Sequence, residues 1–299
     1  MKILNFGSLN IDYVYMVDHF VKPGETETSD DLQVICGGKG LNQSIALARA
    51  GAVVSHAGNI GRSDGQILRE KLESFGVDTG YIREHPCASG HAIIQVDRAG
   101  QNCIVLYGGA NHKVTQSQVD TVLSDLTDGD LVLLQNEINM LDYIIGEAYK
   151  RHIKIAINPS PMNDAILTLP LDKIDFLFLN EIEADAILGG GADGKAAQTI
   201  AARFPRCTVI LTRGEDGVEA MCEGRYYRHG AYRVSAVDTT AAGDTFTGFF
   251  LASYLRGSGM DASLDLASKA AAICVGKKGA SESIPSIAEV ESFSGQVII

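Results

Sequence analysis

Short apolar runs alternate with amphipathic helical patterns along most of this 299-residue chain. The strand-like runs are VVSHAGNIG, DLVLLQN, KIAINPSP, DFLFLN and CTVILTRG. The helical patterns between them cover residues 41–50, 64–75, 116–126, 141–152 and 195–204. Such alternation indicates βαβ units, in which a crossover helix joins two parallel strands. We therefore expect an α/β fold with a mainly parallel central sheet flanked by helices.

Two segments interrupt this alternation. Residues 13–36 contain strand-like runs around KPGETE, and residues 89–107 contain AIIQV and CIVLY joined by the glycine-containing turn DRAGQN. A turn of this kind between two apolar runs predicts a hairpin. The inserted strands could form a small separate sheet, or they could simply extend the edge of the main sheet. Since no linker or internal repeat is visible, we expect residues 1–299 to form one large domain with a small appendage.

Two helix starts match the capping-box pattern. Ser63 is followed three residues later by Gln66, and Thr115 is followed by Gln118. In a capping box the first side chain and the fourth satisfy each other's backbone N–H groups. We therefore expect Ser63 and Thr115 to cap the helices predicted over residues 64–75 and 116–126.

The segment VDTTAAGDTFTGFF, residues 237–250, joins an acidic residue, a turn of small residues and the start of an apolar helix. Backbone N–H groups at Ala241, Ala242 and Gly243 could approach an anion closely, because these side chains are minimal. Asp244 among those donors could accept the proton of an attacking hydroxyl during phosphoryl transfer. The alternative is an ordinary helix start with Asp244 in its first turn. This segment alone leaves both interpretations open.

A second glycine-rich segment precedes the first long helical pattern. The run CGGKGLNQSIALARAGA begins at Cys36 and places Asn42 and Gln43 near the first helical turn. Near the start of the chain, KILNFGSLNID brings Asn10 and Asp12 to the end of an apolar run. Open α/β sheets present polar groups to ligands at such strand ends. The sequence thus combines features of a polyol site with features of a phosphate site.

Four segments together resemble the ribokinase family of sugar kinases. They are GSLNID, GGKGLNQ, NEIEA at residues 180–184 and DTTAAGDTF at residues 238–246. The resemblance implies a Rossmann-like three-layer α/β/α fold with a small β-sheet lid, through which ribokinases commonly form homodimers. It also implies transfer of the ATP γ-phosphoryl group to the 5-hydroxyl of D-ribose, giving D-ribose 5-phosphate. GGKGLNQ with Asn10 and Asp12 resembles the ribose-phosphorylating members more than fructokinases or adenosine kinases.

The resemblance also assigns site residues. Asp244 would be the general base, and the N–H groups of Ala242, Gly243 and Asp244 would form the anion hole. The sugar would contact Asn10, Asp12, Gly38, Lys39, Gly40, Asn42, Glu137 and Asp244. ATP would contact Asn180, Thr212, Arg213, Gly214, Gly217, Gly243 and Ser268. Mg²⁺ would be held through water by Glu183, and K⁺ would lie near Asp238, Thr240, Cys274, Lys277, Gly279 and Ser283.

Several of these residues also have ordinary structural interpretations. Glu137 could be a solvated loop carboxylate, Lys39 a surface cation and Ser268 a small packing residue. Glu183 could simply be a carboxylate in the first turn of a helix. Two positions depart from the family pattern, because Leu41 replaces a small residue and an asparagine precedes Glu137. Each departure could reshape the sugar pocket.

Composition excludes several classes of partner. The formal net charge of −12 argues against binding to nucleic acid or to a membrane surface. No apolar run approaches the roughly 20 residues of a membrane helix, and the N-terminus lacks a signal-peptide pattern, so we expect a cytoplasmic protein. The six cysteines form no CxxC pair and are expected to be reduced core residues. The seven histidines lack zinc-site spacing.

Other functions fit the sequence less well. Gly189, Gly194 and Lys195 match GxxxxGK, but Ala196 occupies the position where a P-loop needs Ser or Thr for Mg²⁺. No GxGxxG follows the first strand, which argues against a Rossmann dehydrogenase. A kinase for another sugar or a nucleoside and a non-catalytic sugar-binding regulator remain as alternatives on the same fold.

Overall fold

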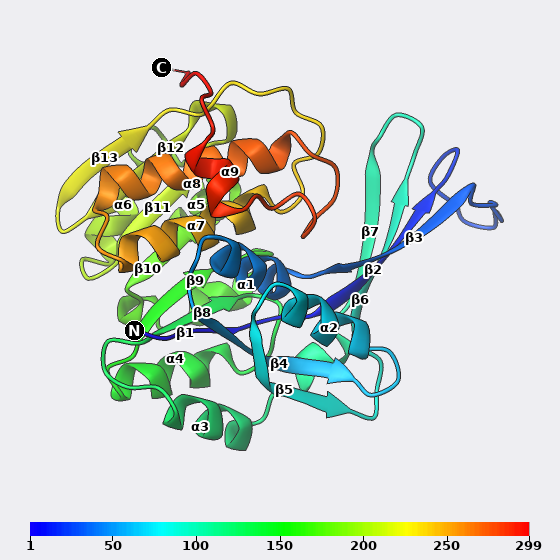
Figure 1. The fold of residues 1–299 in the computed structure, drawn as a ribbon, viewed down its shortest axis with the longest axis horizontal. Helices are drawn as coiled ribbons and strands as arrows, with labels where there is room; N and C mark the ends of the chain where they lie inside the picture. The colour runs from blue at the N-terminus through cyan, green and yellow to red at the C-terminus, as the bar shows by residue number, and fades with distance from the viewer. Residues whose placement is uncertain (299) are drawn as a thin grey trace.

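The computed structural model describes residues 1–298, which are built around a nine-stranded sheet of order β13-β12-β11-β10-β9-β8-β1-β4-β5 (Figure 1). Within this order, the neighbouring strands β11, β10, β9, β8, β1, β4 and β5 run parallel to one another. Strands β12 and β13 add an antiparallel edge next to β11. The strands are β1 (Ile3–Phe6), β4 (Val54–Gly61), β5 (Asp78–His85), β8 (Leu131–Gln135), β9 (Lys154–Asn158), β10 (Phe176–Leu179), β11 (Thr208–Thr212), β12 (Val218–Cys222) and β13 (Arg225–His229). The prediction of a mainly parallel central sheet is confirmed.

Helices cover both faces of this sheet, and each face has its own hydrophobic core. One face packs against α1 (Lys39–Arg49), α2 (Gln66–Ser74), α7 (Ala242–Leu255), α8 (Met260–Val275) and α9 (Ile287–Glu291). The other packs against α3 (Gln116–Ser124), α4 (Leu141–Lys150), α5 (Glu181–Leu188) and α6 (Ala196–Arg203). Short 3-10 segments are η1 (Gly109–Lys113), η2 (Asp164–Thr168), η3 (Leu171–Lys173) and η4 (Gly214–Asp216).

The central strands are apolar because both of their faces are covered. Every residue of β8, with sequence LVLLQ, and of β10, with sequence FLFL, is buried. Parallel strands in three-layer folds read as continuous apolar runs for this reason. None of the described helices is both long enough and apolar enough to span a bilayer.

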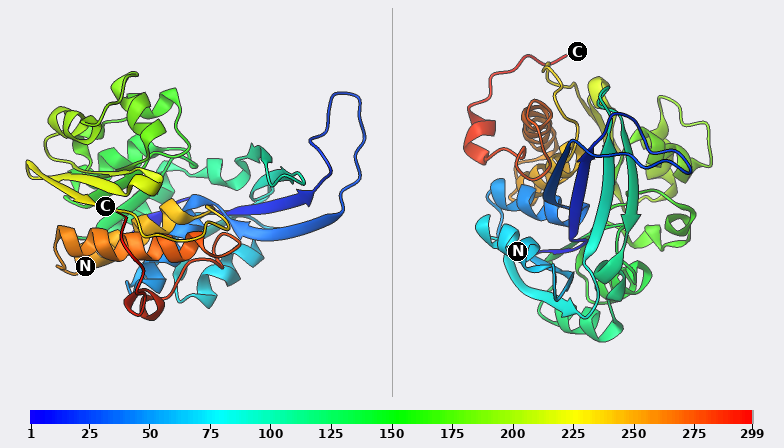
Figure 2. Two further views of the ribbon diagram at one scale, coloured as in Figure 1. Left: turned by 90° about the horizontal axis from the view of Figure 1, so that it is seen from above. Right: turned by 90° about the vertical axis from the view of Figure 1, so that its right-hand side faces the viewer.

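A separate four-stranded sheet, which we call the lid, projects from one end of the main body (Figure 2). Its strands, in the order β3-β2-β6-β7, are β3 (Asp31–Gly37), β2 (Asn10–Met16), β6 (Gly90–Val96) and β7 (Asn102–Tyr107). The β2–β3 and β6–β7 pairs are antiparallel, and β2 pairs with β6 in parallel. The inserted segments therefore form their own sheet rather than extending the edge of the main one.

Some local expectations were wrong. No capping box forms at Ser63, because α2 begins after Gly65 and has no side-chain cap. Thr115 does cap α3 through the Gln118 N–H, but the Gln118 side chain bonds Asn59 instead of completing the box. The hairpin of β12 and β13 was not anticipated from the sequence. Cys103 is exposed on the lid, so the description of all six cysteines as core residues fails there.

Helices α1 and α7 pack closely enough to require a glycine. A Cβ added to Gly248 of α7 would lie 2.4 Å from the Ala46 Cβ and 2.8 Å from the Leu47 N atom of α1. Real side chains do not make such contacts, so any larger residue would push the two helices apart. This contact sets how the N-terminal turns of α1 and α7 lie relative to each other.

We predict that Gly248→Ala destabilises the protein by roughly 1–3 kcal/mol, as overpacking does. Gly146→Ala in α4 is the matched control, because nothing lies within 4 Å of its added Cβ. The control should gain up to about 1 kcal/mol from better helix propensity. Urea unfolding midpoints measure both effects. Equal stability changes in the two variants would contradict the close helix contact.

Candidate active site

A cavity of about 1490 Å³ lies between the lid and the main sheet. Its walls include the inward face of the lid, the N-terminal turns of α1 and α7, and residues at the carboxyl ends of the parallel strands. The strand-end residues are Glu137, Asn158, Asn180 and Thr212. Ligands of open α/β sheets bind at this edge. The cavity therefore has the position expected for an active site.

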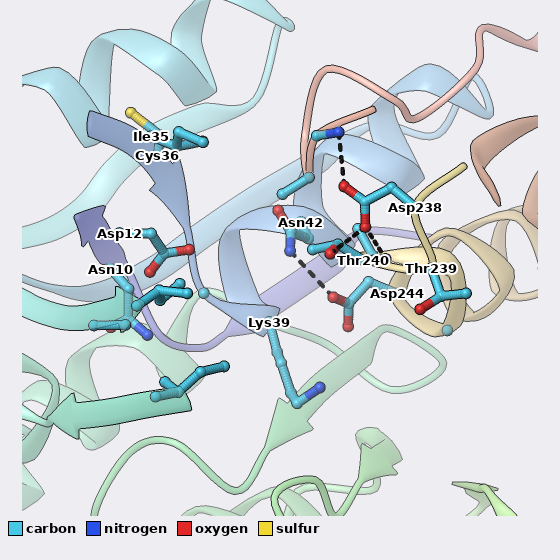
Figure 3. A pocket seen from close by; sticks show the side chains of 18 of the residues that line it. Asn10, Asp12, Ile35, Cys36, Lys39, Asn42, Asp238, Thr239, Thr240 and Asp244 are labelled. Carbon is cyan, nitrogen blue, oxygen red and sulfur yellow. Dashed lines mark hydrogen bonds between the residues drawn. The ribbon is translucent and has the colours of Figure 1, made fainter. Parts of the chain in front are cut away.

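Asn10 and Asp12 of β2 line one end of the cavity (Figure 3). The Asn10 Oδ1 accepts from the Asn111 Nδ2 at 2.7 Å, which fixes the orientation of the Asn10 amide. A Cβ added to Gly37 would lie 2.1 Å from the Asp12 Oδ2, so glycine is needed beside this carboxylate. Burial, followed by the charge of Glu137, raises the pKa of Asp12 to about 7. A polyol could satisfy both side chains with its hydroxyl groups.

Glu137 follows β8 and holds the start of α1 in place. Its Oε2 accepts from the Lys39 N–H at 2.9 Å and also from the Ser8 hydroxyl. The Gly40 N–H donates to the same Ser8 hydroxyl oxygen at 3.1 Å. N-terminal N–H groups of a helix have no partner within the helix, so these contacts satisfy them. Glu137 is thus no solvated loop carboxylate, and burial raises its pKa.

Lys39 points into the cavity rather than out to solvent (Figure 3). Its surroundings are acidic, with Asp244 as the strongest influence and with Glu137 and Glu183 adding to it. These carboxylates raise the pKa of the Lys39 ammonium group. The side chain therefore remains charged and could attract a phosphate or a sugar oxygen.

Asp244 is buried in the first turn of α7, opposite the first turn of α1. The Asn42 Nδ2 donates to its Oδ2 at 3.2 Å (Figure 3). The Gln43 Nε2 donates to its Oδ1 at 2.8 Å. Ala241 precedes the helix in the left-handed region with φ 61°. Asp244 faces the same cavity as Asn10. The structure therefore brings the predicted base and the predicted sugar residues to one space.

The turn before α7 only partly matches the predicted anion hole. The N–H groups of Gly243 and Asp244 belong to a first helical turn, where such donors have no helical partner. The Ala242 N–H instead donates to the Thr239 carbonyl at 3.3 Å. A bound anion would have to compete with that contact to engage Ala242.

The predicted nucleotide residues divide into two groups. Asn180, Thr212 and Gly243 line the cavity, whereas Arg213, Gly214, Gly217 and Ser268 are not among its lining residues. The Arg213 guanidinium is engaged with Glu219 at 2.9 Å. A Cβ at Gly217 would lie 2.1 Å from the His229 carbonyl oxygen, so close strand packing explains this glycine.

Glu183 lines the cavity and also caps its own helix. Its side chain accepts from the Asn180 N–H at 2.9 Å, and the Asn180 side chain accepts from the Glu183 N–H at 2.9 Å. Burial raises the pKa of Glu183. The helix role seen here and the predicted Mg²⁺ role are compatible, because a carboxylate has several acceptor sites.

The predicted K⁺ residues gather where two loops meet. The Asp238 carboxylate accepts from the Thr240 N–H at 2.9 Å and from the Gly279 N–H at 3.0 Å. The Cys274 Sγ lies 3.0 Å from the Ser283 Oγ. Lys277 differs from the others, since its side chain pairs with Glu289 at 2.7 Å. Its backbone carbonyl is the only part that could serve a cation.

Several polar residues of this site were not predicted from the sequence. Asn158 and Ser160 line the cavity, and Ser8 links Glu137 to α1. Asn158 and Ser160 lie at or just after the end of β9, so the strand-end rule applied to NPSP could have found them. Ser8 lies in the recognised segment GSLNID but carries no signal of its own.

We predict that Asp12→Asn stabilises the protein in a pH-dependent way. The pKa of Asp12 is about 7 in the folded state against 3.8 for an ordinary aspartate. Between these pH values the folded protein binds more protons than the unfolded one, so the unfolding free energy falls as pH rises. The variant has no carboxyl group at this position, so its unfolding free energy does not fall in this way. Its gain in melting temperature over the wild type should grow from pH 4.5 to pH 7 and then level off. Asp31→Asn, at an exposed position of the same lid, is the control. A gain independent of pH would contradict the raised pKa.

Comparison with known proteins agrees with this geometry. The chain matches the family described as pfkB family carbohydrate kinase over residues 1–287. It is 36% identical to a ribokinase of Haemophilus influenzae over 96% of both chains, and 32% identical to a deoxyribokinase of Salmonella typhi over 98% of both. The structure of Arabidopsis thaliana ribokinase complexed with ribose and ATP is similar, with a TM-score of 0.86, 28% identity, and coverage of 98% of this chain and 99% of that one.

Proposed function

Because this chain belongs to the pfkB family of carbohydrate kinases, we propose that it transfers the γ-phosphoryl group of ATP to the 5-hydroxyl of D-ribose, giving D-ribose 5-phosphate. The main support for this proposal is the position of Asp244. Its carboxylate is held by two amide donors at the N-terminus of α7 and faces the cavity that Asn10 and Asp12 line. The Arabidopsis ribokinase, with ribose and ATP bound, supports the choice of both substrates.

In this proposal Asp244 accepts the proton of the attacking hydroxyl. The sugar is oriented by the Asn10 amide and the carboxyl groups of Asp12 and Glu137, with Gly38 and Asn42 in the same cavity lining. Gly40 is not among the lining residues, because its N–H and carbonyl groups bond Ser8 and Asn5. The N–H groups of Gly243 and Asp244 stabilise the charge of the transferring phosphoryl group, because they point from a helix N-terminus. Lys39 adds a positive charge from α1. These contributions are directed at charge that develops in the transition state, which is where they accelerate the reaction.

The nucleotide is proposed to enter from the side of Asn180 and Thr212. Arg213, Gly214, Gly217 and Ser268 lie outside the cavity lining and would contribute through the loop after β11 or through helix α8. Mg²⁺ bound to the phosphates would neutralise their charge. Glu183 fits water-mediated contact with it, since Mg²⁺ usually keeps several waters and few protein carboxylates.

A monovalent cation, K⁺, is proposed near the loop that precedes α7. The donor set fits a hard cation, because Asp238, Thr240, Gly279 and Ser283 can supply carboxylate, hydroxyl and carbonyl oxygens. Cys274 and Lys277 would contribute backbone oxygens only. A cation here would stiffen the turn that presents Gly243 and Asp244. Activity should then be higher in KCl than in NaCl at equal concentration.

We predict that Asp244→Asn lowers kcat by a factor of about 100 to 10,000, the range for loss of general acid–base catalysis. The substitution preserves the shape of the side chain, so ATP binding should change little. The melting temperature should fall, because the new NH₂ group faces the amide donor of Asn42 or Gln43. A coupled ADP-release assay with D-ribose, 2-deoxyribose, fructose and adenosine measures turnover of the wild type and the variant. Near-normal kcat in the variant would exclude Asp244 as the base.

The same assay decides the substrate. D-ribose should have the highest kcat/KM, while 2-deoxyribose is the second candidate because a deoxyribokinase is 32% identical to this chain. A preference of about tenfold for another sugar or for adenosine, equal to about 1.4 kcal/mol, would overturn ribose as the substrate. Sugar binding without any turnover would favour a non-catalytic regulator.

We also propose that the chain forms a homodimer through the outward face of the lid. That face presents large exposed side chains, with Leu32 48%, Ile93 42%, Val105 64% and Tyr107 52% accessible. Contiguous exposed apolar residues are uncommon on monomers and typical of interfaces. We further propose a cytoplasmic location, with sugar and ATP as small-molecule partners and with no nucleic-acid or membrane partner.

Val105→Glu should convert the dimer to a monomer, because it places a charge in the middle of the apolar face. Val53→Glu is the matched control, since Val53 is 82% accessible and lies outside the lid. Light scattering during size-exclusion chromatography gives the mass of each variant. A wild-type monomer at micromolar concentration would contradict the dimer.

A further inference from the structure

A continuous set of buried polar side chains lies beneath Asp244 and crosses from α1 to β4. We infer that Gln43 is a positioning residue for Asp244, and that Gln135 and the residues behind it fix the direction in which the Gln43 amide donates. The inference rests on the proposed function of Asp244 as the base. The residues behind Gln135 are Asn5, Ser44 and His56.

Gln43 follows the first turn of α1 and is fully buried. Its Nε2 donates to the Asp244 Oδ1 at 2.8 Å and to the Asn158 Oδ1 at 3.3 Å. Its Oε1 accepts from the Gln135 Nε2 at 2.7 Å. An ionised carboxylate can only accept, so the amide must present its NH₂ group to Asp244. A rotated Gln43 amide would instead place two acceptors face to face.

Gln135 is the last residue of β8, and its orientation is set from the other side. Its Nε2 also donates to the Asn5 Oδ1 at 2.9 Å. Asn5 in turn donates from its Nδ2 to the Gly40 carbonyl at 2.7 Å. Since a carbonyl accepts only, Asn5 must present its Oδ1 to Gln135. Both N–H bonds of Gln135 are therefore committed, one toward Asn5 and one toward Gln43.

The set ends at His56 of β4. The Asn5 Nδ2 also donates to the Ser44 Oγ at 2.9 Å, and the Ser44 hydroxyl lies 2.8 Å from the His56 Nδ1. The His56 Nε2 lies 3.3 Å from the Gly7 carbonyl oxygen, which requires hydrogen on Nε2 and leaves Nδ1 as an acceptor. Complete burial lowers the pKa of His56 to about 4, so the ring is neutral at pH 7. Each donor in the set thus has an acceptor.

One atom in this set argues against a purely structural role. The buried Gln135 Oε1 has no hydrogen-bond partner among the described residues. A buried acceptor without a partner costs free energy, and an apolar side chain of the same shape would avoid that cost. A Cβ at Gly7 would lie 2.3 Å from this oxygen, so glycine leaves room for it. What the glutamine provides and an apolar residue lacks is the donor to Gln43.

Loss of the Gln135 donor should lower kcat and leave substrate binding unchanged. Gln135 is fully buried and is not among the cavity-lining residues, so it touches neither the sugar nor ATP. Its effect on the reaction passes through Gln43, which holds the Asp244 carboxylate at a fixed angle to the attacking hydroxyl. Small errors in such an angle lower the rate of proton transfer without changing substrate affinity.

The test compares Gln135→Met with Gln118→Met. Methionine has nearly the volume of glutamine but no donor, so Gln43 loses its fixed orientation in the first variant. Gln118 is a matched control, because it is equally buried and its Nε2 donates to Asn59 at 2.9 Å, away from the cavity. We expect Gln135→Met to lower kcat about tenfold, which is less than the loss from removing a donor that contacts Asp244 itself. The KM values for sugar and for ATP should stay within about twofold of the wild-type values. Gln118→Met should lose comparable melting temperature but keep kcat.

A double-mutant cycle completes the experiment. Gln43→Met should lower kcat about a hundredfold. The double variant Gln43→Met with Gln135→Met should be no slower than Gln43→Met alone, because Gln135 is inferred to act on Asp244 through Gln43. If the kcat losses of the two single variants multiply in the double variant, the inference is overturned. It is also overturned if Gln135→Met keeps the wild-type kcat. If Gln135→Met does not fold, Gln135→Glu takes its place, since it keeps the shape and can donate at most one hydrogen.

A failure of the positioning role can be told apart from a failure of the proposed sugar phosphorylation. Wild type and Asp244→Asn are measured in the same assay. An inactive wild type would reject sugar phosphorylation itself. An active wild type and an inactive Asp244→Asn, together with an unaffected Gln135→Met, would reject only the positioning role.

Discussion

The site depends on the meeting of two helix N-termini, those of α1 and α7. Asn42 and Gln43 donate to Asp244 across 202 and 201 residues of sequence, so the catalytic geometry exists only when these helices pack correctly. Gly248 permits that packing by letting α7 approach Ala46 closely. Both helices also direct the positive ends of their dipoles toward the cavity. The anion-stabilising turn and the proposed base are therefore placed by one tertiary contact.

The cavity is electrostatically unfavourable without its ligands. Burial raises the pKa of Asp12, Glu137 and Glu183, which shows that ionising these carboxyl groups is costly in the folded protein. Lys39 offsets part of this charge, because it lies near Asp244 as well as two of them. Sugar hydroxyls and cations would relieve the rest. Such a site lowers the stability of the folded protein, and its pocket favours hydrogen-bond donors and positive charge.

Sequence patterns predicted what is local and missed what depends on packing. The start of α7, the polar residues Asn10 and Asp12 and the strands of the lid followed from short motifs and periodicity. The separation of the lid from the main sheet was implied only by the family resemblance. The link from Gln135 through Asn5 to His56 could not be predicted, since it joins side chains of three strands that meet only in the folded sheet. The capping box expected at Ser63 failed because Gly65 precedes α2. Arg213 lies outside the cavity because Glu219, brought close by the unanticipated β12, holds it.

If Asp244 is the base, its carboxylate must contact the reacting hydroxyl of the sugar. A crystal structure with D-ribose and a non-hydrolysable ATP analogue measures this contact directly. We predict that the primary hydroxyl oxygen lies about 2.6–3.2 Å from an Asp244 carboxylate oxygen, on a line with the γ-phosphorus. A primary hydroxyl bound to Glu137 or Asp12 instead, with Asp244 separated from it by more than one water, would contradict the role of Asp244 as the base.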